Sequence, residues 1–161
     1  MFRLIDSPLG PLRLQASPRG LSRVEFTAAS ILQKEMGGVE EGDVGKRSAD
    51  VLDTAQAQLT EYFAGRRRSF ELPLDPPTTT EFRAAVHAQL AEIGYGETVT
   101  YRDVAKLLGR PGATRAVGSA CGANPLLIVR PCHRVLRSDG GLGGYAGGLE
   151  AKRFLLTLEE N

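Results

Sequence analysis

The five residues PCHRV at positions 131–135 hold a thiol beside an imidazole, and the segments on either side predict how that pair is presented. The apolar run LLIV at 126–129 predicts a short buried strand or extended segment, and the glycine-rich stretch 140–148 predicts a loop that a ligand can approach closely. A free cysteine has a pKa of about 8.5, so Cys132 needs a base or a positive field to become a thiolate at neutral pH. His133 is the nearest candidate base. Neighbouring residues of an extended segment point to opposite sides, so a direct contact between Cys132 and His133 requires a turn. A water that bridges the two side chains could carry the proton equally well.

A cysteine beside a histidine is more often a packing feature than a catalytic one, so the rest of the chain must decide. Its 161 residues, 42% hydrophobic and 24% charged, suffice for one sizeable core or two small ones. A formal net charge of +1 does not indicate a strongly basic nucleic-acid binder, so any DNA contact must be local. We expect the two cysteines, Cys121 and Cys132, to be reduced thiols. The first 20 residues do not resemble a secretion signal, and no apolar run reaches membrane-spanning length, which predicts a cytoplasmic protein.

The first part of the chain predicts a small sheet with one helix. Residues 2–5, 11–16 and 21–26 are short segments separated by the turn sequences SPLG and SPRG, a pattern typical of a three-stranded antiparallel meander. Residues 27–47 have no sustained periodicity and predict a long, partly mobile connection. The apolar spacing from Ala49 onward predicts a helix that stops at Gly65.

A change of character follows, from strands to helices. Residues 70–74 predict a short strand, and the sequence DPP at 75–77 is the best linker in the chain. We therefore predict two domains, residues 1–74 and 75–161, and an α+β fold.

The second part predicts a series of short helices. Thr80 can cap the first, Thr100 begins the second with Asp103 completing a capping box, and Thr114 can cap a third over 115–122. The second and third helices, joined by a short Gly- and Pro-containing turn, are typical of a helix-turn-helix, although a plain helical hairpin has the same pattern. The apolar side chains expected to face the core of these helices and of a last helix at 149–158 include Phe82, Ala85, Val86, Leu90, Ile93, Val104, Leu107, Leu108, Leu149, Phe154, Leu155 and Leu158.

The third helix is unusually slim. Residues 116–122 are all small, so they cannot reach base edges in a deep major groove. A slim helix can instead bring its backbone close to a minor groove, where phosphate contacts position the protein. Arg115 is the one long side chain, and its alternative role is a surface ion pair.

Several motifs, taken in order and spacing, resemble the O6-alkylguanine-DNA alkyltransferase family over roughly residues 70–160. These motifs are FELPLD at 70–75, YGETVTY at 95–101, RAVG at 115–118, NP at 124–125, PCHRV at 131–135 and GGYAGGL at 143–149. The resemblance implies an N-terminal ribonuclease H-like domain and a C-terminal, mostly helical domain that carries the helix-turn-helix and the active-site cysteine. It also implies direct-reversal DNA repair, in which each molecule irreversibly takes an alkyl group from O6 of guanine, and from O4 of thymine, onto its own cysteine.

The resemblance assigns the catalytic roles as well. Cys132 would attack the alkyl carbon in line, and His133, acting through a water and oriented by Glu159, would make the thiolate. Asn124 would tie the turn before the strand to the active-site loop. Within the substrate pocket, the resemblance places Val135, Tyr145, Ala146 and Gly147.

DNA contacts are implied in the same way. Tyr101 would rotate the phosphate of the target nucleotide and donate its hydroxyl to the leaving guanine, while Arg115 would fill the gap in the duplex. Ala116, Gly118 and Ser119 would contact DNA along the slim helix. Because the alkyl carbon of a stacked guanine is shielded from in-line attack, the nucleotide must flip into the pocket, at a cost of a few kcal/mol. The implied partner is double-stranded DNA containing alkylated guanine, bound by a monomer, with cooperativity along the DNA left open.

No cofactor and no metal are expected. Some relatives bind zinc in the N-terminal domain, but this chain has no cysteine or histidine before His87. His87 itself stands where the family usually has tryptophan, and we expect it to fill a core or half-exposed position. Gly94 stands where proline is usual, and Thr79 stands where glycine is usual.

Two other classes remain as alternatives. An alkyltransferase-like protein would bind lesions without catalysis, but such relatives lack the acceptor cysteine that this chain has at position 132. A Cys-His hydrolase would need an orienting third residue and an oxyanion hole, and neither can be placed from the sequence.

Overall fold

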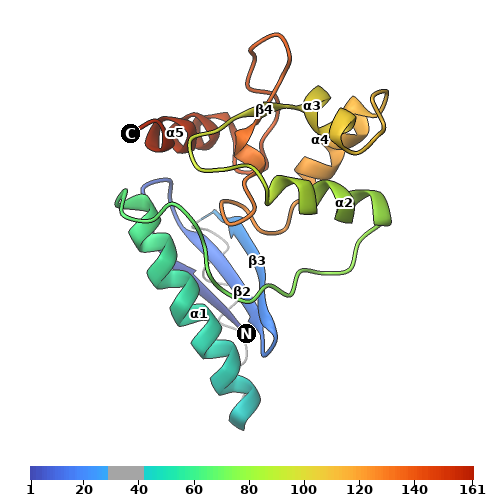
Figure 1. Cartoon of the computed structure of the whole chain (residues 1–161). Coiled ribbons are helices and arrows are strands. Elements are labelled where there is room, and N and C mark those ends of the chain that lie inside the picture. The colour runs from blue at the N-terminus through green and yellow to red at the C-terminus, as the bar shows by residue number, and fades with distance from the viewer. Residues whose placement is uncertain (29–41) are drawn as a thin grey trace. The chain divides into compact units, whose positions relative to one another are not determined.

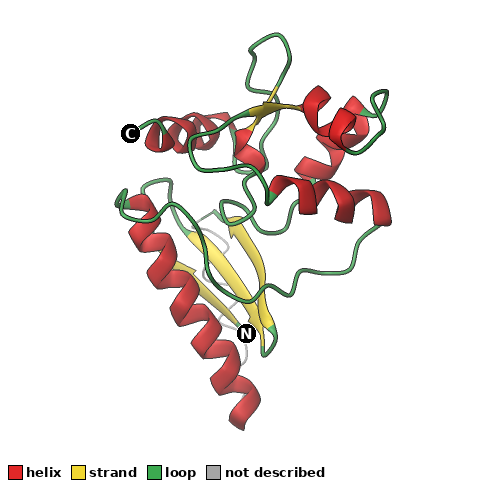
Figure 2. Cartoon of the chain, in the orientation of Figure 1, coloured by secondary structure: helices red, strands yellow, loops and turns green. Residues whose placement is uncertain are grey.

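The computed structural model describes residues 1–28 and 42–161 and divides the chain into two compact units, Met1–Pro77 and Thr78–Asn161 (Figure 1). The first unit is a sheet with a helix, and the second is mostly helical (Figure 2). This arrangement confirms the predicted α+β fold. Within the described residues, no helix has the length and apolar character needed to cross a membrane.

The sheet of the first unit is the predicted antiparallel meander. Strands β1 (Phe2–Ile5), β2 (Leu12–Ser17) and β3 (Gly20–Phe26) lie in the order β1-β2-β3. The central strand alternates buried and half-buried residues, as a strand with one covered face should. The helix α1 (Gly42–Phe63) packs on β2 and β3.

The start of α1 corrects the sequence prediction. Residues 42–47 were assigned to the connection, but they form the first turns of the helix. Its buried face there consists of Gly45 and Ser48, which are too small and too polar to give an apolar period. The rest of the predicted connection, residues 29–41, lies outside the described residues.

The predicted strand at 70–74 was wrong. Only an isolated parallel bridge joins Leu74 to Leu21, with the Leu21 amide donating to the Pro73 carbonyl at 2.9 Å. Pro73 has no amide hydrogen to continue a ladder. A Cβ on Gly20 would lie 2.6 Å from the Pro73 carbonyl carbon, so glycine is required for this close approach.

Four helices of the second unit follow the predicted order. They are α2 (Glu81–Leu90), α3 (Tyr101–Leu107), α4 (Thr114–Gly122) and α5 (Leu149–Glu159). A two-residue strand, β4 (Val99–Thr100), lies before α3 and was not predicted. A 3-10 turn, η2 (Cys132–Arg134), leads into β5 (Val135–Leu136), which pairs in parallel with β4. Helices α2 and α3 both pack against α4, and η2 packs against α5.

Helix capping follows the sequence at two of three positions. The Thr80 side chain accepts from the Arg83 amide at 3.3 Å, and Thr100 and Asp103 form the predicted capping box. Thr114 was predicted to cap α4, but it is the first helical residue, and no side chain caps that helix.

Some predicted core residues are exposed, which corrects the expected apolar faces. The side chain of Leu107 is 65% exposed, and Leu149 and Phe154 are 45% and 36% exposed. Leu107 lies on α3, and Leu149 and Phe154 lie on α5. Both helices are short, and neither forms a buried face wide enough to cover all of its apolar residues.

Residues 126–129 form a buried turn instead of a strand. Leu126, Leu127 and Ile128 are buried as predicted, but Ile128 has a φ of 71°, and the Arg130 amide donates to the Leu126 carbonyl at 2.9 Å. The Asn124 side chain also accepts a hydrogen bond from the Leu126 amide at 3.0 Å. That amide is therefore not available to pair with a neighbouring strand.

Candidate active site

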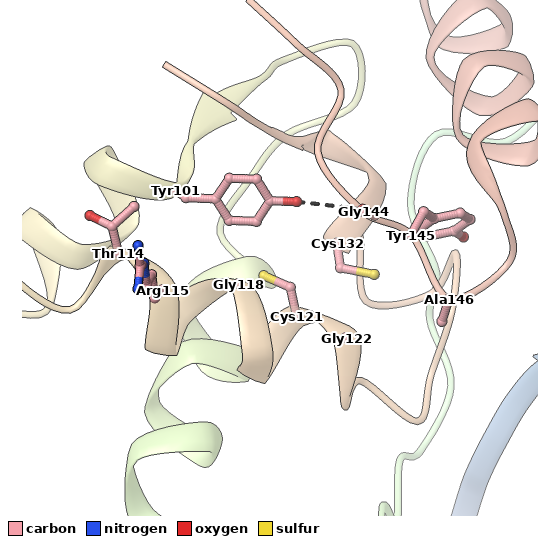
Figure 3. A pocket seen from close by; sticks show the side chains of 10 residues that line it. All are labelled: Tyr101, Thr114, Arg115, Gly118, Cys121, Gly122, Cys132, Gly144, Tyr145 and Ala146. Carbon is pink, nitrogen blue, oxygen red and sulfur yellow. Dashed lines mark hydrogen bonds between the residues drawn. The ribbon is translucent and has the colours of Figure 1, made fainter. Parts of the chain in front are cut away.

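A cavity of about 530 Å³ lies among α3, α4, the η2 turn and the glycine-rich loop (Figure 3). Cys132 lies on the η2 turn and lines this cavity. The sequence analysis had required a turn at this point for Cys132 to contact the following histidine directly. The lining residues are Tyr101, Thr114, Arg115, Gly118, Cys121, Gly122, Cys132, Gly144, Tyr145 and Ala146.

The Cys132 thiol is almost fully buried, and its surroundings act on its pKa in opposite directions. Burial raises the pKa of the thiol and outweighs the other effects. Hydrogen bonding from Asn124 and the positive charges of Lys152 and Arg130 lower the same pKa. Cys132 is therefore a protonated thiol in the resting protein, and forming the thiolate requires a base.

His133, the next residue in the chain, is the candidate for that base. Its Nε2 atom lies 2.8 Å from Glu159 Oε2, and because a carboxylate only accepts, Nε2 carries the hydrogen. Burial lowers the pKa of His133 despite the nearby carboxylate, so the ring is neutral and its Nδ1 has a lone pair. No described protein group hydrogen-bonds to Nδ1. A neutral imidazole with a free acceptor atom, oriented through its other nitrogen, is the usual arrangement of a general base.

Glu159 holds two neighbours at once. Besides His133, it accepts from Arg134 Nε at 2.6 Å, and Arg134 Nη1 donates to the Ile93 carbonyl at 2.6 Å. Burial raises the pKa of Glu159, but the hydrogen bonds from His133 and Arg134 more than offset this and lower it overall. Glu159 is therefore an ionised carboxylate at neutral pH.

Asn124 shapes the chain just before the cysteine. Its Nδ2 donates to the Arg130 carbonyl at 2.8 Å, and its Oδ1 accepts from the Leu126 amide at 3.0 Å. The bond to Arg130 spans the buried turn that precedes Pro131, and the bond to Leu126 holds the first residue of that turn. The side chain thus fixes the direction from which Cys132 enters the cavity.

Lys152, which the sequence analysis did not single out, is fully buried on the inner face of α5. Its Nζ donates to the Val135 carbonyl at 2.7 Å, to the Gly144 carbonyl at 3.2 Å and to the Leu142 carbonyl. No carboxylate pairs with it among the described residues, and burial lowers its pKa. Its position gave a signal, because it shares the helical spacing of the buried Leu155 and Glu159 and so had to point inward.

Tyr101 begins α3 and borders the same cavity. Its hydroxyl donates to the Gly144 carbonyl at 3.5 Å (Figure 3). The same hydroxyl lies 3.5 Å from Lys152 Nζ. Burial raises the pKa of Tyr101 to about 12, so the phenol keeps its proton. A Cβ on Gly143 would lie 2.7 Å from the Tyr101 ring, so glycine is needed where the loop crosses this side chain.

The predicted DNA-contacting residues of α4 share one side of the helix. Arg115, Ala116 and Ser119 are exposed and Gly118 is half-buried, while Val117 and Ala120 face the core. Among the described residues Arg115 forms no ion pair, the alternative role considered for it. Its guanidinium lies at the edge of the cavity (Figure 3).

The structure does not bring every predicted pocket residue to the cavity. Tyr145 and Ala146 line it, but Val135 and Gly147 do not. Val135 is buried in β5, where its carbonyl accepts from Lys152.

His87 is buried, in agreement with the core position that was one of the two expected for it. Its Nε2 donates to the Ala120 carbonyl at 2.7 Å. In the parts of the chain that the structure describes, no cluster of three or more histidine, cysteine or acidic side chains is placed to hold a metal.

Comparison with known families matches both units. The ribonuclease-like domain of 6-O-methylguanine DNA methyltransferase matches residues 1–76, and the DNA binding domain of the same family matches residues 81–161. Among individual proteins, the chain is 42% identical to the methylated-DNA–protein-cysteine methyltransferase of Methanosarcina barkeri, over 99% of this chain and 97% of that one.

Solved structures give the same result. The Mycobacterium tuberculosis O6-methylguanine methyltransferase superposes with a TM-score of 0.80 at 39% identity. A second structure from that organism, in complex with DNA, superposes with a TM-score of 0.82 at 40% identity. Each alignment covers 99% of this chain and 92% of the solved one.

Proposed function

The chain belongs to the 6-O-methylguanine DNA methyltransferase family, and we propose that it transfers the alkyl group from O6 of guanine in double-stranded DNA irreversibly to Cys132. Its general function is the repair of DNA by alkyl transfer, catalysed by the protein that accepts the group. The observation that carries the assignment is the buried thiol of Cys132, which lines the cavity and is followed in the chain by a neutral imidazole held by Glu159.

The chemical step is an in-line displacement. The Cys132 sulfur forms a bond to the alkyl carbon while the bond from that carbon to O6 breaks, and the bonding electrons leave with O6. The thiol proton passes to His133 Nδ1 through one water, and Glu159 stabilises the imidazolium that forms. Because the product is a thioether, no step regenerates the thiol and each molecule acts once.

Tyr101 supplies a hydrogen bond to the leaving base. Its pKa of about 12 keeps the phenol protonated across the physiological range, so the hydroxyl can donate to O6 as negative charge develops there. Lys152 lies behind the hydroxyl and holds the loop carbonyls that border the base. This placement supports a positioning role for Lys152.

DNA binding occurs through the slim helix α4 and the minor groove. The exposed Ala116 and Ser119 and the half-buried Gly118 let the helix backbone approach the DNA, and the target nucleotide flips into the cavity. Arg115, which forms no ion pair with the described residues and lies at the cavity edge, fills the space that the flipped base leaves. Residues 75–161 are the catalytic, DNA-binding domain of a cytoplasmic monomer, and O4-alkylthymine is a second substrate.

Intact-protein mass spectrometry tests the transfer. The protein is incubated with duplex DNA that carries one O6-methylguanine, and we expect a gain of one methylene unit, mapped to Cys132. Cys132→Ala should show no gain, while Cys121→Ala, a matched loss of the other thiol, should keep it. Tight binding of the lesion with unchanged mass would replace this proposal with the alkyltransferase-like, non-catalytic function.

Arg115→Ala tests the flipping step separately from the chemistry. We expect transfer from duplex DNA to slow at least about tenfold, because an unfilled stack costs on the order of a few kcal/mol. Transfer from free O6-methylguanine base, which needs no flipping, should change little. Equal losses on both substrates would contradict the stack-filling role.

A further inference from the structure

Helix α4 has few means of its own to stay ordered. It has nine residues, and an isolated helix shorter than roughly 12–15 residues is marginal in water. Gly118 lies in its interior and weakens it relative to alanine, and no side chain caps its first turn. Its buried side chains, those of Val117, Ala120 and Cys121, are small. The helix that presents Arg115 must therefore be held in place by its neighbours.

One neighbour, α2, holds α4 through a buried hydrogen bond as well as by packing (Figure 1). His87 Nε2 lies 2.7 Å from the Ala120 carbonyl oxygen, and because a carbonyl only accepts, Nε2 carries the hydrogen. His87 is 4% exposed and Ala120 is fully buried. Water therefore cannot replace the imidazole if the bond is lost.

The bond is made at the end of α4, where backbone partners are scarce. The last four carbonyls of a helix lack their regular partner, and that of Ala120 is among them. The Asn124 amide, four residues on, donates to the Cys121 carbonyl, and the Ala123 amide reaches the Ala120 carbonyl at 3.2 Å. His87 provides the shorter bond to the Ala120 carbonyl. It therefore fixes the last turn of α4, from which Cys121 lines the cavity.

We infer that His87 is a positioning residue for transfer from duplex DNA, because its bond to Ala120 keeps α4 ordered and seated against α2 for the DNA to bind. The inference rests on the proposed function, since it concerns the helix that presents Arg115 in that reaction. His87 is not among the residues that line the cavity, so it acts through α4 and not on the reacting atoms.

The groups that carry out the chemistry are held separately. Cys132 and His133 lie on η2, which packs against α5, and Glu159 of α5 bonds to His133. A free base can therefore still react when α4 is less ordered. Duplex DNA needs the ordered helix, and if only a fraction of the molecules has it, the apparent affinity for DNA falls by that fraction. The loss of the bond from His87 should thus raise the duplex concentration that half-saturates the protein, and leave the rate at saturation nearly unchanged.

An uncharged donor can take the place of His87. Burial lowers the pKa of His87, the bond to Ala120 raises it, and the positive charges of Arg130 and Arg83 lower it again. The net shift is downward, so at neutral pH the ring donates as an uncharged N–H. Glutamine offers an uncharged N–H at a similar reach, whereas phenylalanine offers a ring without a donor.

Single-turnover rates of methyl transfer to Cys132, measured over a range of concentrations of an O6-methylguanine duplex, test the inference. His87→Phe should raise the half-saturating duplex concentration about tenfold, the size expected when a buried carbonyl loses a partner. Its rate at saturating duplex and its rate with free O6-methylguanine base should change little. His87→Gln should bring the half-saturating concentration back near the wild-type value. In His87→Phe, hydrogen exchange should become faster at the amides of α4 and stay constant at those of α5.

Binding without chemistry separates this inference from the proposed function. In the Cys132→Ala background, which cannot accept the methyl group, the anisotropy of a labelled duplex should show the same loss of affinity for His87→Phe and the same recovery for His87→Gln. No methyl transfer by the wild-type protein would overturn the proposed function, while the anisotropy would still report how His87 holds α4 for DNA.

Three outcomes would overturn the inference. They are an unchanged half-saturating concentration in His87→Phe, an equal loss with duplex and with free base, and a loss in His87→Gln as large as that in His87→Phe. If His87→Phe melts below the assay temperature, His87→Met is measured in its place, since methionine fills irregular gaps and has no donor. Its expected effects are the same, and they are judged by the same three outcomes.

Discussion

The two units of this protein bury different kinds of side chain. In the first unit, the polar side chains buried among the described residues are the neutral Ser48 and Gln58. The second unit, similar in size, buries His87, Asn124, His133, Arg134, Lys152 and Glu159. Buried charges contribute little to stability even when they are paired, and they are costly when a partner is lost. The second unit therefore carries groups that its stability does not require, and two of them, Asn124 and Lys152, lower the pKa of the Cys132 thiol.

The largest expected effect removes the centre of the charged cluster. Glu159→Ala leaves Arg134 buried without its carboxylate and His133 without its acceptor, so we expect the second unit to lose about 3–5 kcal/mol. Hydrogen exchange of the α5 amides measures this loss. The matched change in the first unit is Gln58→Ala, which removes two bonds to the Glu71 backbone and should cost about 1–3 kcal/mol in α1. Similar losses in both units would remove the contrast between them.

Alkylation of Cys132 is the next largest change, and it occurs in the second unit alone. The added group enters a position that is almost fully buried, and overpacking of this kind costs about 1–3 kcal/mol. We expect a lower melting temperature after reaction with O6-methylguanine DNA, with faster hydrogen exchange in residues 78–161. Cys132→Ala treated in the same way is the control. A melting temperature that stays constant or rises would contradict the expectation.

Mild acid should also separate the units, because the chain's two histidines, His87 and His133, both lie in the second. Burial lowers the pKa of each, so below pH 6.5 the unfolded chain takes up protons that the folded unit does not. Stability is thus fully present above pH 6.5 and is lost as the pH falls, at up to about 1.4 kcal/mol per pH unit for each histidine.

From pH 7.5 to 5.5 we expect the second unit to lose about 1–2 kcal/mol, measured by hydrogen exchange corrected for its intrinsic pH dependence. Protection in α1 should stay constant. The variant His87→Gln keeps a donor for the Ala120 carbonyl and should reduce the acid effect. Equal acid sensitivity in both units would show that other groups control it.

The contrast between the units also explains what the sequence could predict. Local signals were sufficient for the meander and for the Thr100 capping box, because turn residues and a cap act within a few positions. The placement of His133 beside Glu159 came from family resemblance, since no local rule joins residues so far apart in the chain. The buried turn at 126–129 was missed because an apolar run has the same composition in a turn and in a strand.

Lys152 shows a different limit of sequence reasoning. Lysine is rarely buried, so composition assigns it to the surface even where helical spacing points it inward. What keeps it inside is a set of backbone carbonyls from 135, 142 and 144, which converge only after the loop has folded. A partner set made of backbone atoms leaves no trace in residue identities.

The smallest expected effect concerns ion pairs, which exist in both units but in different surroundings. Arg3 and Asp53 of the first unit lie 2.6 Å apart, with the Asp53 side chain 66% exposed, whereas Glu159 beside Arg134 is 2% exposed. We expect Asp53→Asn to change stability by about 0–1 kcal/mol, and this change should disappear in 1 M salt, where the screening length is about 3 Å. The loss caused by Glu159→Gln should persist in the same salt, because solvent ions do not reach a buried pair. Unfolding curves at low and high salt measure both. If salt changed the effect of Glu159→Gln, water and ions would have to reach Glu159 and Arg134. The charges of the second unit would then not be buried, and the difference from the exposed pair of the first unit would be lost.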